Sequence, residues 1–199
     1  GIIASMLVIR AIFKVKMEKE SRQIEEENQS SQLVPHVVTY KVENKLIFGR
    51  TLDDLTKLID RNFVVSRIKH NDEVIIPNSD TTLQEGDLLL VVLSLHDESA
   101  LEAFIGRPVE MNWEAIPAPV VSRRILVTRP EFNGRKIGSL RLRMGYRLNA
   151  TRVNRAGLDL LANPNLELQI GDRLTVVGRI EDINRLAEKL GNSTKRLHE

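Results

Sequence analysis

The sequence predicts an α/β fold of the α+β kind, built from two tandem β-α-β-β-β-α sandwich domains that follow an N-terminal helix. The first observation is an internal repeat, because residues 38–106 align without a gap on the residues 85 positions later. The second is that β-branched runs and helix-period segments follow one another in the same order in both halves. The third is an ordinary globular composition, with 42% hydrophobic and 28% charged residues, which excludes a chain that is disordered throughout.

Identical residues between the two copies are most frequent toward the end of each half. Across the 69 aligned positions, 16 residues are identical, several times what unrelated segments of this composition would give. The identical residues of the first half include Gly49, Arg67, Leu83, Gly86, Asp87, Leu89, Val91 and Gly106, which fall on Gly134, Arg152, Leu168, Gly171, Asp172, Leu174, Val176 and Gly191. We infer two copies of one small domain.

The elements of the first copy follow from its local patterns. Thr51 offers an N-cap before an acidic turn, and apolar residues at Leu52, Leu55 and Ile59 share one helical face. A second helix closes at Gly106. Strands are expected at Val37–Val42, Phe63–Ile68, Val74–Ile76 and Asp87–Leu93, and the last helix carries Ala100, Leu101, Phe104 and Ile105 on one face.

The second copy repeats this order. Its first helix is expected over Ile137–Met144, ending at Gly145, and its last helix ends at Gly191. Strands are expected at Ile125–Thr128, Leu148–Val153, Leu158–Leu161 and Asp172–Val177, and the last helix carries Ile183, Leu186, Ala187 and Leu190 on one face.

The start of the chain predicts a membrane context. The uniformly apolar stretch Gly1–Ile9 is too short to span a bilayer alone, but basic residues follow it from Arg10, as at the cytoplasmic end of a spanning helix. The alternative is an amphipathic helix packed on the protein's own core. The expected organisation is the end of a membrane helix with a charged helix and linker (1–36), domain 1 (37–106), a Pro-rich connector (107–121), domain 2 (122–191), and a tail leading to further membrane helices (192–199).

The connector contains the one tryptophan of the chain. Pro108, Pro117 and Pro119 forbid a regular helix there and favour an extended segment. We expect Trp113 to attach the connector to a domain surface, and stacking on a ligand is the alternative.

At this point a family resemblance emerges. The stretches VIIPNSDTTLQEGDLLLVV and LDLLANPNLELQIGDRLTVVG, each after a strand that holds Arg67 or Arg152, resemble the TrkA C-terminal domain of regulators of potassium conductance. The likeness covers both repeats, although copy two has Ala162 where copy one has Pro77. Two such modules after an apolar segment resemble the cytosolic insert of the aspartate:alanine exchanger family of bacterial transporters, where they lie between two halves of membrane helices.

The resemblance implies a regulatory module on the cytoplasmic face of the bacterial inner membrane, with the transmembrane halves of the same polypeptide as partners and a homodimer as the expected assembly. In related modules a nucleotide such as cyclic di-AMP binds near the second and third strands of a paired interface. Carried to this chain, the expected ligand-binding residues are Arg67, Lys69, His70, Pro77, Arg152, Asn154 and Arg155. The alternative for each is a role in the surface or in strand pairing. The alternatives for the module are a purely structural assembly domain and a gating insert of a potassium channel or transporter.

The two copies carry opposite charge. Residues 37–106 hold 7 Lys and Arg against 12 Asp and Glu, whereas residues 122–191 hold 14 against 7. Attraction between copies explains this, and so does an anionic ligand or anionic lipid on an arginine-rich surface. The arginines in question are Arg141, Arg143, Arg147, Arg152 and Arg155. With a net charge of only +2, the whole chain gives no reason to expect nucleic acid as a partner.

Nothing in the sequence predicts catalysis, a metal or a cofactor. The chain has no cysteine, and its four histidines (His36, His70, His96 and His198) are not spaced as ligands on one helix. Phosphate-binding glycine loops and the nucleophile-elbow motif are absent from the sequence. We therefore predict a regulatory protein and not an enzyme.

Overall fold

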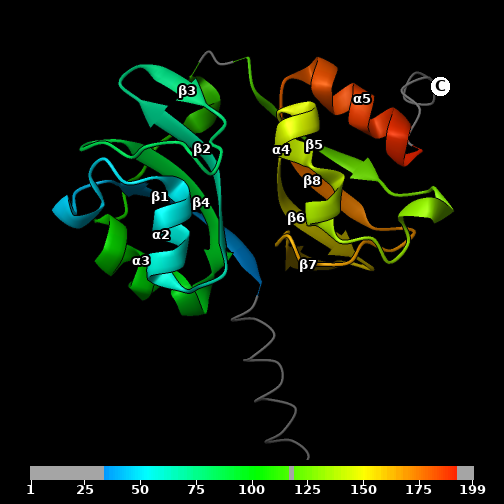
Figure 1. Ribbon diagram of the computed structural model, residues 1–199, viewed down its shortest axis with the longest axis horizontal. Coiled ribbons are helices and arrows are strands. Elements are labelled where there is room, and N and C mark those ends of the chain that lie inside the picture. Colours follow the sequence, from blue (N-terminus) through cyan, green and yellow to red (C-terminus); the bar gives the residue numbers. More distant parts are fainter. Residues whose placement is uncertain (1–33, 117–118, 192–199) are drawn as a thin grey trace, which may run out of the picture. The chain divides into compact units, whose positions relative to one another are not determined.

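The computed structural model describes residues 34–116 and 119–191. They form two four-stranded antiparallel sheets, each with its own helices (Figure 1), and this confirms the predicted fold class. The expected N-terminal helix, its membrane segment and the tail from residue 192 lie outside the described residues. Within the described residues, no helix is long and apolar enough to cross a bilayer.

The sheet of the first copy has the strand order β1-β4-β2-β3. Its helices α2 and α3 contribute buried leucines and isoleucines to one core with the strands. The elements are β1 (Pro35–Lys41), α2 (Leu52–Ile59), β2 (Phe63–His70), β3 (Glu73–Ile75), β4 (Leu88–Ser94) and α3 (Glu98–Ile105), with single 3-10 turns at Lys45–Ile47 and Leu95–Asp97.

The sheet of the second copy has the equivalent order, β5-β8-β6-β7. Its elements are β5 (Val121–Leu126), α4 (Leu142–Tyr146), β6 (Asn149–Arg155), β7 (Leu158–Leu161), β8 (Arg173–Gly178) and α5 (Ile180–Leu190), with 3-10 turns at Pro130–Phe132 and Ile137–Leu140. Even the isolated bridge Thr51–Thr82 has its equivalent 85 residues later, in Lys136–Glu167.

The first helix differs between the copies, and here the sequence prediction for copy two was wrong. In copy one, the Thr51 side chain accepts the Asp54 N–H while the Asp54 carboxylate accepts the Thr51 N–H, so the capping box starts a regular helix. In copy two, the expected helix Ile137–Met144 is broken at Arg141, which has φ 49°. Gly138 and Ser139 are weak helix formers, and no side chain caps the start of this segment.

Two strand boundaries also differ from the prediction. Pro35 and His36, assigned by sequence to the linker, already belong to β1, and β5 starts at Val121 instead of Ile125.

After α3 the chain runs along the outer edge of β1, where Lys41 N–H donates to Arg107 O and Val109 N–H donates to Thr39 O. The connector then enters a 3-10 turn at Trp113–Ala115, and the Trp113 indole N–H donates to Thr39 Oγ1 at 2.8 Å. Trp113 thus attaches the connector to copy one, as the sequence predicted.

Candidate functional site

A β-bulge at the same place in each copy decides where two predicted site residues point. Val65 and Ile68 both belong to the core of copy one, although three positions apart in β2. Side chains of a regular strand alternate between the two faces of the sheet, so two residues on the same face are separated by an even number of positions. Val65 and Ile68 can share the core face only because the strand is irregular between them. The register of β2 against β4 shifts between Val65 and Arg67, and this places Ser66 in a bulge and leaves Arg67 outside the core cluster.

Copy two has the equivalent shift between Ala150 and Arg152 in β6. Ala150 and Val153 belong to its core cluster and Arg152 does not. The bulge at Thr151 therefore directs Arg152 to the sheet face opposite its own core. The two arginines that the repeat aligns are also equivalent in space within their domains.

The sheet faces opposite the two cores pack against each other. Val92 and Val177 are repeat equivalents that belong to neither core cluster, yet they are only 3% and 2% exposed. Strands β2 and β6 are in contact, and the Asn149 side-chain amide donates to the Val65 carbonyl. Burying both valines stabilises this contact by about 2 kcal/mol for each side chain that becomes fully covered.

A cavity of about 390 Å³, which we call the arginine cavity, lies between these faces. Four guanidinium-bearing residues line it, two from the bulged strands and two from β5, beside the hydroxyls of Ser66, Ser122, Thr151 and Thr175. One carboxylate, that of Asp159, also lines it, but its Oδ1 already accepts the Asn154 amide at 2.8 Å. The four arginines are Arg67, Arg123, Arg124 and Arg152.

Arg67 is the most constrained of the four. Its Nε is buried and has no hydrogen-bond partner in the described part of the chain. Burial lowers the pKa of the Arg67 guanidinium, and the nearby carboxylate of Glu114 opposes this. Arginine stays protonated in spite of such shifts, so Arg67 adds a positive charge to the lining of the cavity. A phosphate or carboxylate would pair with this charge.

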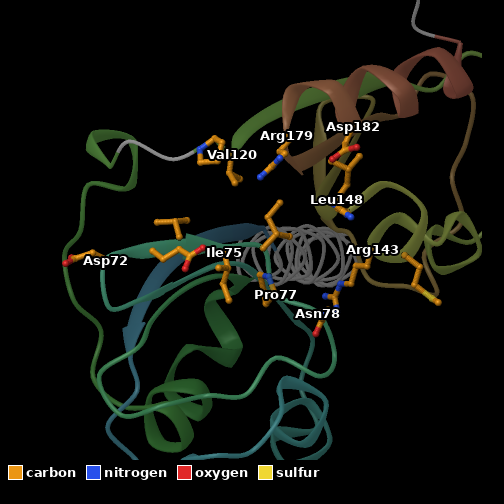
Figure 2. A pocket seen from close by; sticks show the side chains of 15 residues that line it. Asp72, Ile75, Pro77, Asn78, Val120, Arg143, Leu148, Arg179 and Asp182 are labelled. Atoms are coloured by element: carbon orange, nitrogen blue, oxygen red, sulfur yellow. The ribbon is translucent and has the colours of Figure 1, made fainter.

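A larger cavity of about 680 Å³, which we call the hairpin cavity, is shown in Figure 2. The predicted site residue Pro77 lines it, together with Asn78 and the residues of the β2–β3 hairpin from Asp72 onward. Arg143, Arg147 and Arg179 line it from copy two. In Figure 2 the Arg143 guanidinium points toward Pro77 and Asn78, and Arg179 reaches into the opening near Val120.

The remaining predicted site residues interact with carboxylates of their own copy. Lys69 Nζ lies 3.3 Å from Asp72 Oδ1, and Asn154 donates to Asp159. His70 Nδ1 lies 2.7 Å from Asp87 Oδ1. Its repeat equivalent Arg155 donates to both oxygens of Asp172, and these bonds raise the pKa of Arg155.

The structure therefore brings Arg67 and Arg152 together at one cavity and Pro77 at another. Sequence reasoning missed Arg123, Arg124 and Arg179. The signal for the first two was a pair of adjacent arginines next to the buried Ile125 of a strand. Among the described residues, no cluster of three or more histidine, aspartate or glutamate side chains could hold a metal ion.

Comparison with known proteins agrees with the repeat. The TrkA-C domain family matches residues 37–106 and 121–191. A protein of Bacteroides thetaiotaomicron named as an uncharacterized transporter is 47% identical over 197 residues, which is 99% of this chain and 36% of that protein. Another transporter so named, from Bacteroides fragilis, is 40% identical over 202 residues, again over 36% of its length. The chain thus spans about a third of the length of these relatives.

Two solved structures are also similar. The RCK domain of GsuK shares 11% identity over 79% of this chain and 63% of that one, with a TM-score of 0.38. The RCK C domain of the potassium transport protein KtrA, solved in complex with cyclic di-AMP, shares 30% identity over 35% of this chain and 80% of that one, with a TM-score of 0.31.

Proposed function

The chain belongs to the TrkA-C domain family, and from this premise we propose that it is the ligand-sensing regulatory module of a multi-pass membrane transporter. The relatives named as transporters support the transporter context, because they match this chain along nearly its whole length. They are also about three times as long, which leaves room for the transmembrane halves of the same polypeptide. On this proposal the module lies on the cytoplasmic face of the bacterial inner membrane.

We assign the transporter to the aspartate:alanine exchanger type. The apolar start of the chain, followed by basic residues, supports this assignment, because such a module would directly follow a spanning helix. A gating insert of a potassium channel or transporter is the second candidate, and it differs in the membrane part of the protein.

The observation that carries the sensing role is the arginine cavity. Four guanidinium-bearing residues line the cavity where the two copies meet, and the buried Nε of Arg67 has no hydrogen-bond partner in the described part of the chain. Four guanidinium groups against the one carboxylate of Asp159 leave an excess of positive charge in the cavity, so a bound anion would stabilise the contact between copies. We propose a small anionic ligand, with cyclic di-AMP as the first nucleotide to test, held by Arg67 and Arg152 as the symmetric pair.

Regulation would follow from this location. A ligand that contacts both copies binds one arrangement of the pair more tightly than another and shifts the equilibrium between the two arrangements. The shift can be no larger than the difference in the ligand's affinity for them, and this limits the effect on the transporter. We assign no reaction to the module: His70 and Arg155 each hold a buried aspartate, which is a structural role.

The experiment is a thermal-shift titration of residues 1–199 with cyclic di-AMP, cyclic di-GMP, ATP and inorganic phosphate. At a hundred times the dissociation constant, a ligand should stabilise the fold by about 2.7 kcal/mol, which is a readily measured rise in Tm. Arg67→Ala and Arg152→Ala should each remove the rise. Arg173→Ala is the matched control, because Arg173 is exposed on β8 and lines neither cavity.

If no anion raises the Tm, or if the rise in Tm persists in both variants, the result would favour the other candidate role, a purely structural assembly module. That role predicts a homodimer whose mass, measured by analytical ultracentrifugation, does not depend on any of the four ligands. The homodimer itself is expected under both proposals, because the resemblance to TrkA C-terminal modules implies it.

A further inference from the structure

The hairpin cavity has two chemically different walls. One comes from the β2–β3 hairpin of copy one and the segment after it, residues 72–78. The other comes from α4 and the start of α5 in copy two, and residues 119–120 of the connector complete the lining. At about 680 Å³, the cavity falls in the range of sites that hold ligands well above the size of a single amino acid.

The wall from copy two presents uncommitted positive charge. Arg143, Arg147 and Arg179 line it, and none of them forms an ion pair within the described part of the chain. The carboxylate on the same wall, Asp182, is bound by Arg185 at 2.7 Å. An anionic group entering from solvent would therefore find guanidinium donors that no carboxylate occupies.

The wall from copy one presents uncommitted negative charge. Glu73 lines the cavity and forms no ion pair among the residues that the structure describes. Its neighbour Asp72 lies 3.3 Å from Lys69 with a fully exposed carboxylate, so that pair contributes little. A ligand that carried only negative charge would meet repulsion from Glu73 on this side.

Apolar side chains lie between the charged groups. Figure 2 shows Ile75 and Pro77 from copy one near the middle of the cavity, with Leu148 on the side of copy two and Val120 above. Such a surface fits the apolar body of a ligand and gives a free ion no partner.

From this arrangement we propose that the hairpin cavity binds a short zwitterionic peptide with apolar side chains. Its ammonium group lies at Glu73, its carboxylate at the guanidinium wall, and its side chains cover Ile75, Pro77 and Leu148. This site goes beyond the proposed anion sensing: it uses a different cavity and a ligand of different charge. Because both copies contribute walls, the peptide too would favour one arrangement of the pair.

The test is isothermal titration of residues 1–199 with three probes that differ only at their ends: the dipeptide Leu-Leu, its N-acetyl derivative and its C-terminal amide. Leu-Leu should bind in a saturable manner. Each capped derivative should bind about tenfold more weakly or worse, because each loses one charge-assisted contact.

Two variants test which wall of the cavity binds the ammonium end of the peptide and which binds its carboxylate end. Glu73→Gln should abolish the preference for Leu-Leu over the N-acetyl derivative and leave the preference over the amide. Arg179→Gln should do the reverse. Arg173→Ala is the control, because Arg173 lines neither cavity, and it should leave all three affinities unchanged. Anion sensing is tested separately, by the thermal-shift titration with Arg67→Ala, so failure of this proposal and failure of anion sensing are distinguishable.

Three results would overturn the proposal: no binding of Leu-Leu at millimolar concentration, equal affinity for all three probes, or tighter binding of the N-acetyl derivative. The last would mean that the cavity takes amphipathic anions. Loss of all binding in both variants, with Tm unchanged, would also contradict the assignment of separate ends.

Discussion

Arg155 donates two hydrogen bonds to Asp172, from Nε to Oδ1 at 2.9 Å and from Nη2 to Oδ2 at 2.8 Å. The same position of copy one holds His70, which reaches Asp87 through Nδ1 alone. Both aspartates are buried, with side chains 1% and 3% exposed. Copy two thus holds its buried carboxylate with a permanent charge and two contacts, and copy one holds its own with a single contact from an imidazole nitrogen.

This difference predicts unequal effects of substitution. Arg155→Ala leaves a buried carboxylate without its cation and should lower the free energy of unfolding by about 2–3 kcal/mol. His70→Arg gives copy one the two-point contact of copy two and should raise it by about 1 kcal/mol. Urea unfolding at neutral pH measures both, with Arg173→Ala as a control within about 0.5 kcal/mol of the parent. A neutral Arg155→Ala would contradict the prediction.

The capping box of α2 predicts an acid-dependent contribution to stability. Hydrogen bonds from the Thr51 backbone and side chain lower the pKa of Asp54 below its ordinary value. A depressed folded pKa means that the stabilisation is present above the ordinary pKa of about 4 and is lost as pH falls through the folded value. The unfolding free energy of Asp54→Asn should therefore fall less steeply below about pH 4 than that of the parent.

Thr51→Ala tests the second hydrogen bond of the same capping box. It removes the acceptor for the Asp54 N–H and should cost about 1 kcal/mol at neutral pH. Copy two supplies the control, since no side chain caps its segment at Lys136, and Lys136→Ala should be neutral within about 0.5 kcal/mol. Equal losses at the two positions would count against the capping assignment. Circular dichroism during urea titration reports both.

Two glycines predict opposite responses to alanine. Gly106 has φ 139°, and a methyl group there would collide with the Lys41 carbonyl oxygen, so Gly106→Ala should cost about 2–3 kcal/mol. Gly145 lies in α4 without a positive φ and with no atom within 4 Å of an added Cβ, so Gly145→Ala should gain about 0.5 kcal/mol. Thermal unfolding of the two variants side by side measures the difference. A stabilised Gly106→Ala variant would show that the approach of α3 to β1 is loose.

The tryptophan of the connector predicts coupling between two residues far apart in sequence. Trp113→Phe keeps an aromatic ring but loses the indole donor to Thr39 Oγ1 and should cost about 1 kcal/mol. Thr39→Val removes the acceptor. In a double-mutant cycle the two losses should fall short of additivity by about 1 kcal/mol, whereas additive losses would mean that the hydrogen bond contributes nothing.

Much of the fold was predictable because it repeats. A strand prediction weak in one copy, such as Val74–Ile76, gained support from its equivalent Leu158–Leu161, and both exist within one residue of the predicted bounds. The helix Ile137–Met144 failed for a local reason: Arg141 adopts a left-handed conformation that apolar periodicity does not reveal.

The candidate site was less predictable, because it depends on backbone register and on contact between copies. The bulges at Ser66 and Thr151 cannot be read from residue types, yet they decide that Arg67 and Arg152 leave their cores. Arg123 and Arg124 become relevant when β5 lines a cavity with β2, which no pattern within one copy indicates. His70 and Arg155 offered hydrogen-bond donors for a ligand, but buried aspartates of their own copies hold them.

The contact between β2 and β6 joins two domains of one polypeptide, and this has a kinetic consequence. A short connector holds each copy at a high effective concentration near the other, so their encounter is unimolecular and does not weaken when the protein is dilute. Two separate identical chains would have to keep one self-complementary surface. Fused copies escape that constraint, and each can evolve its own half of the contact independently.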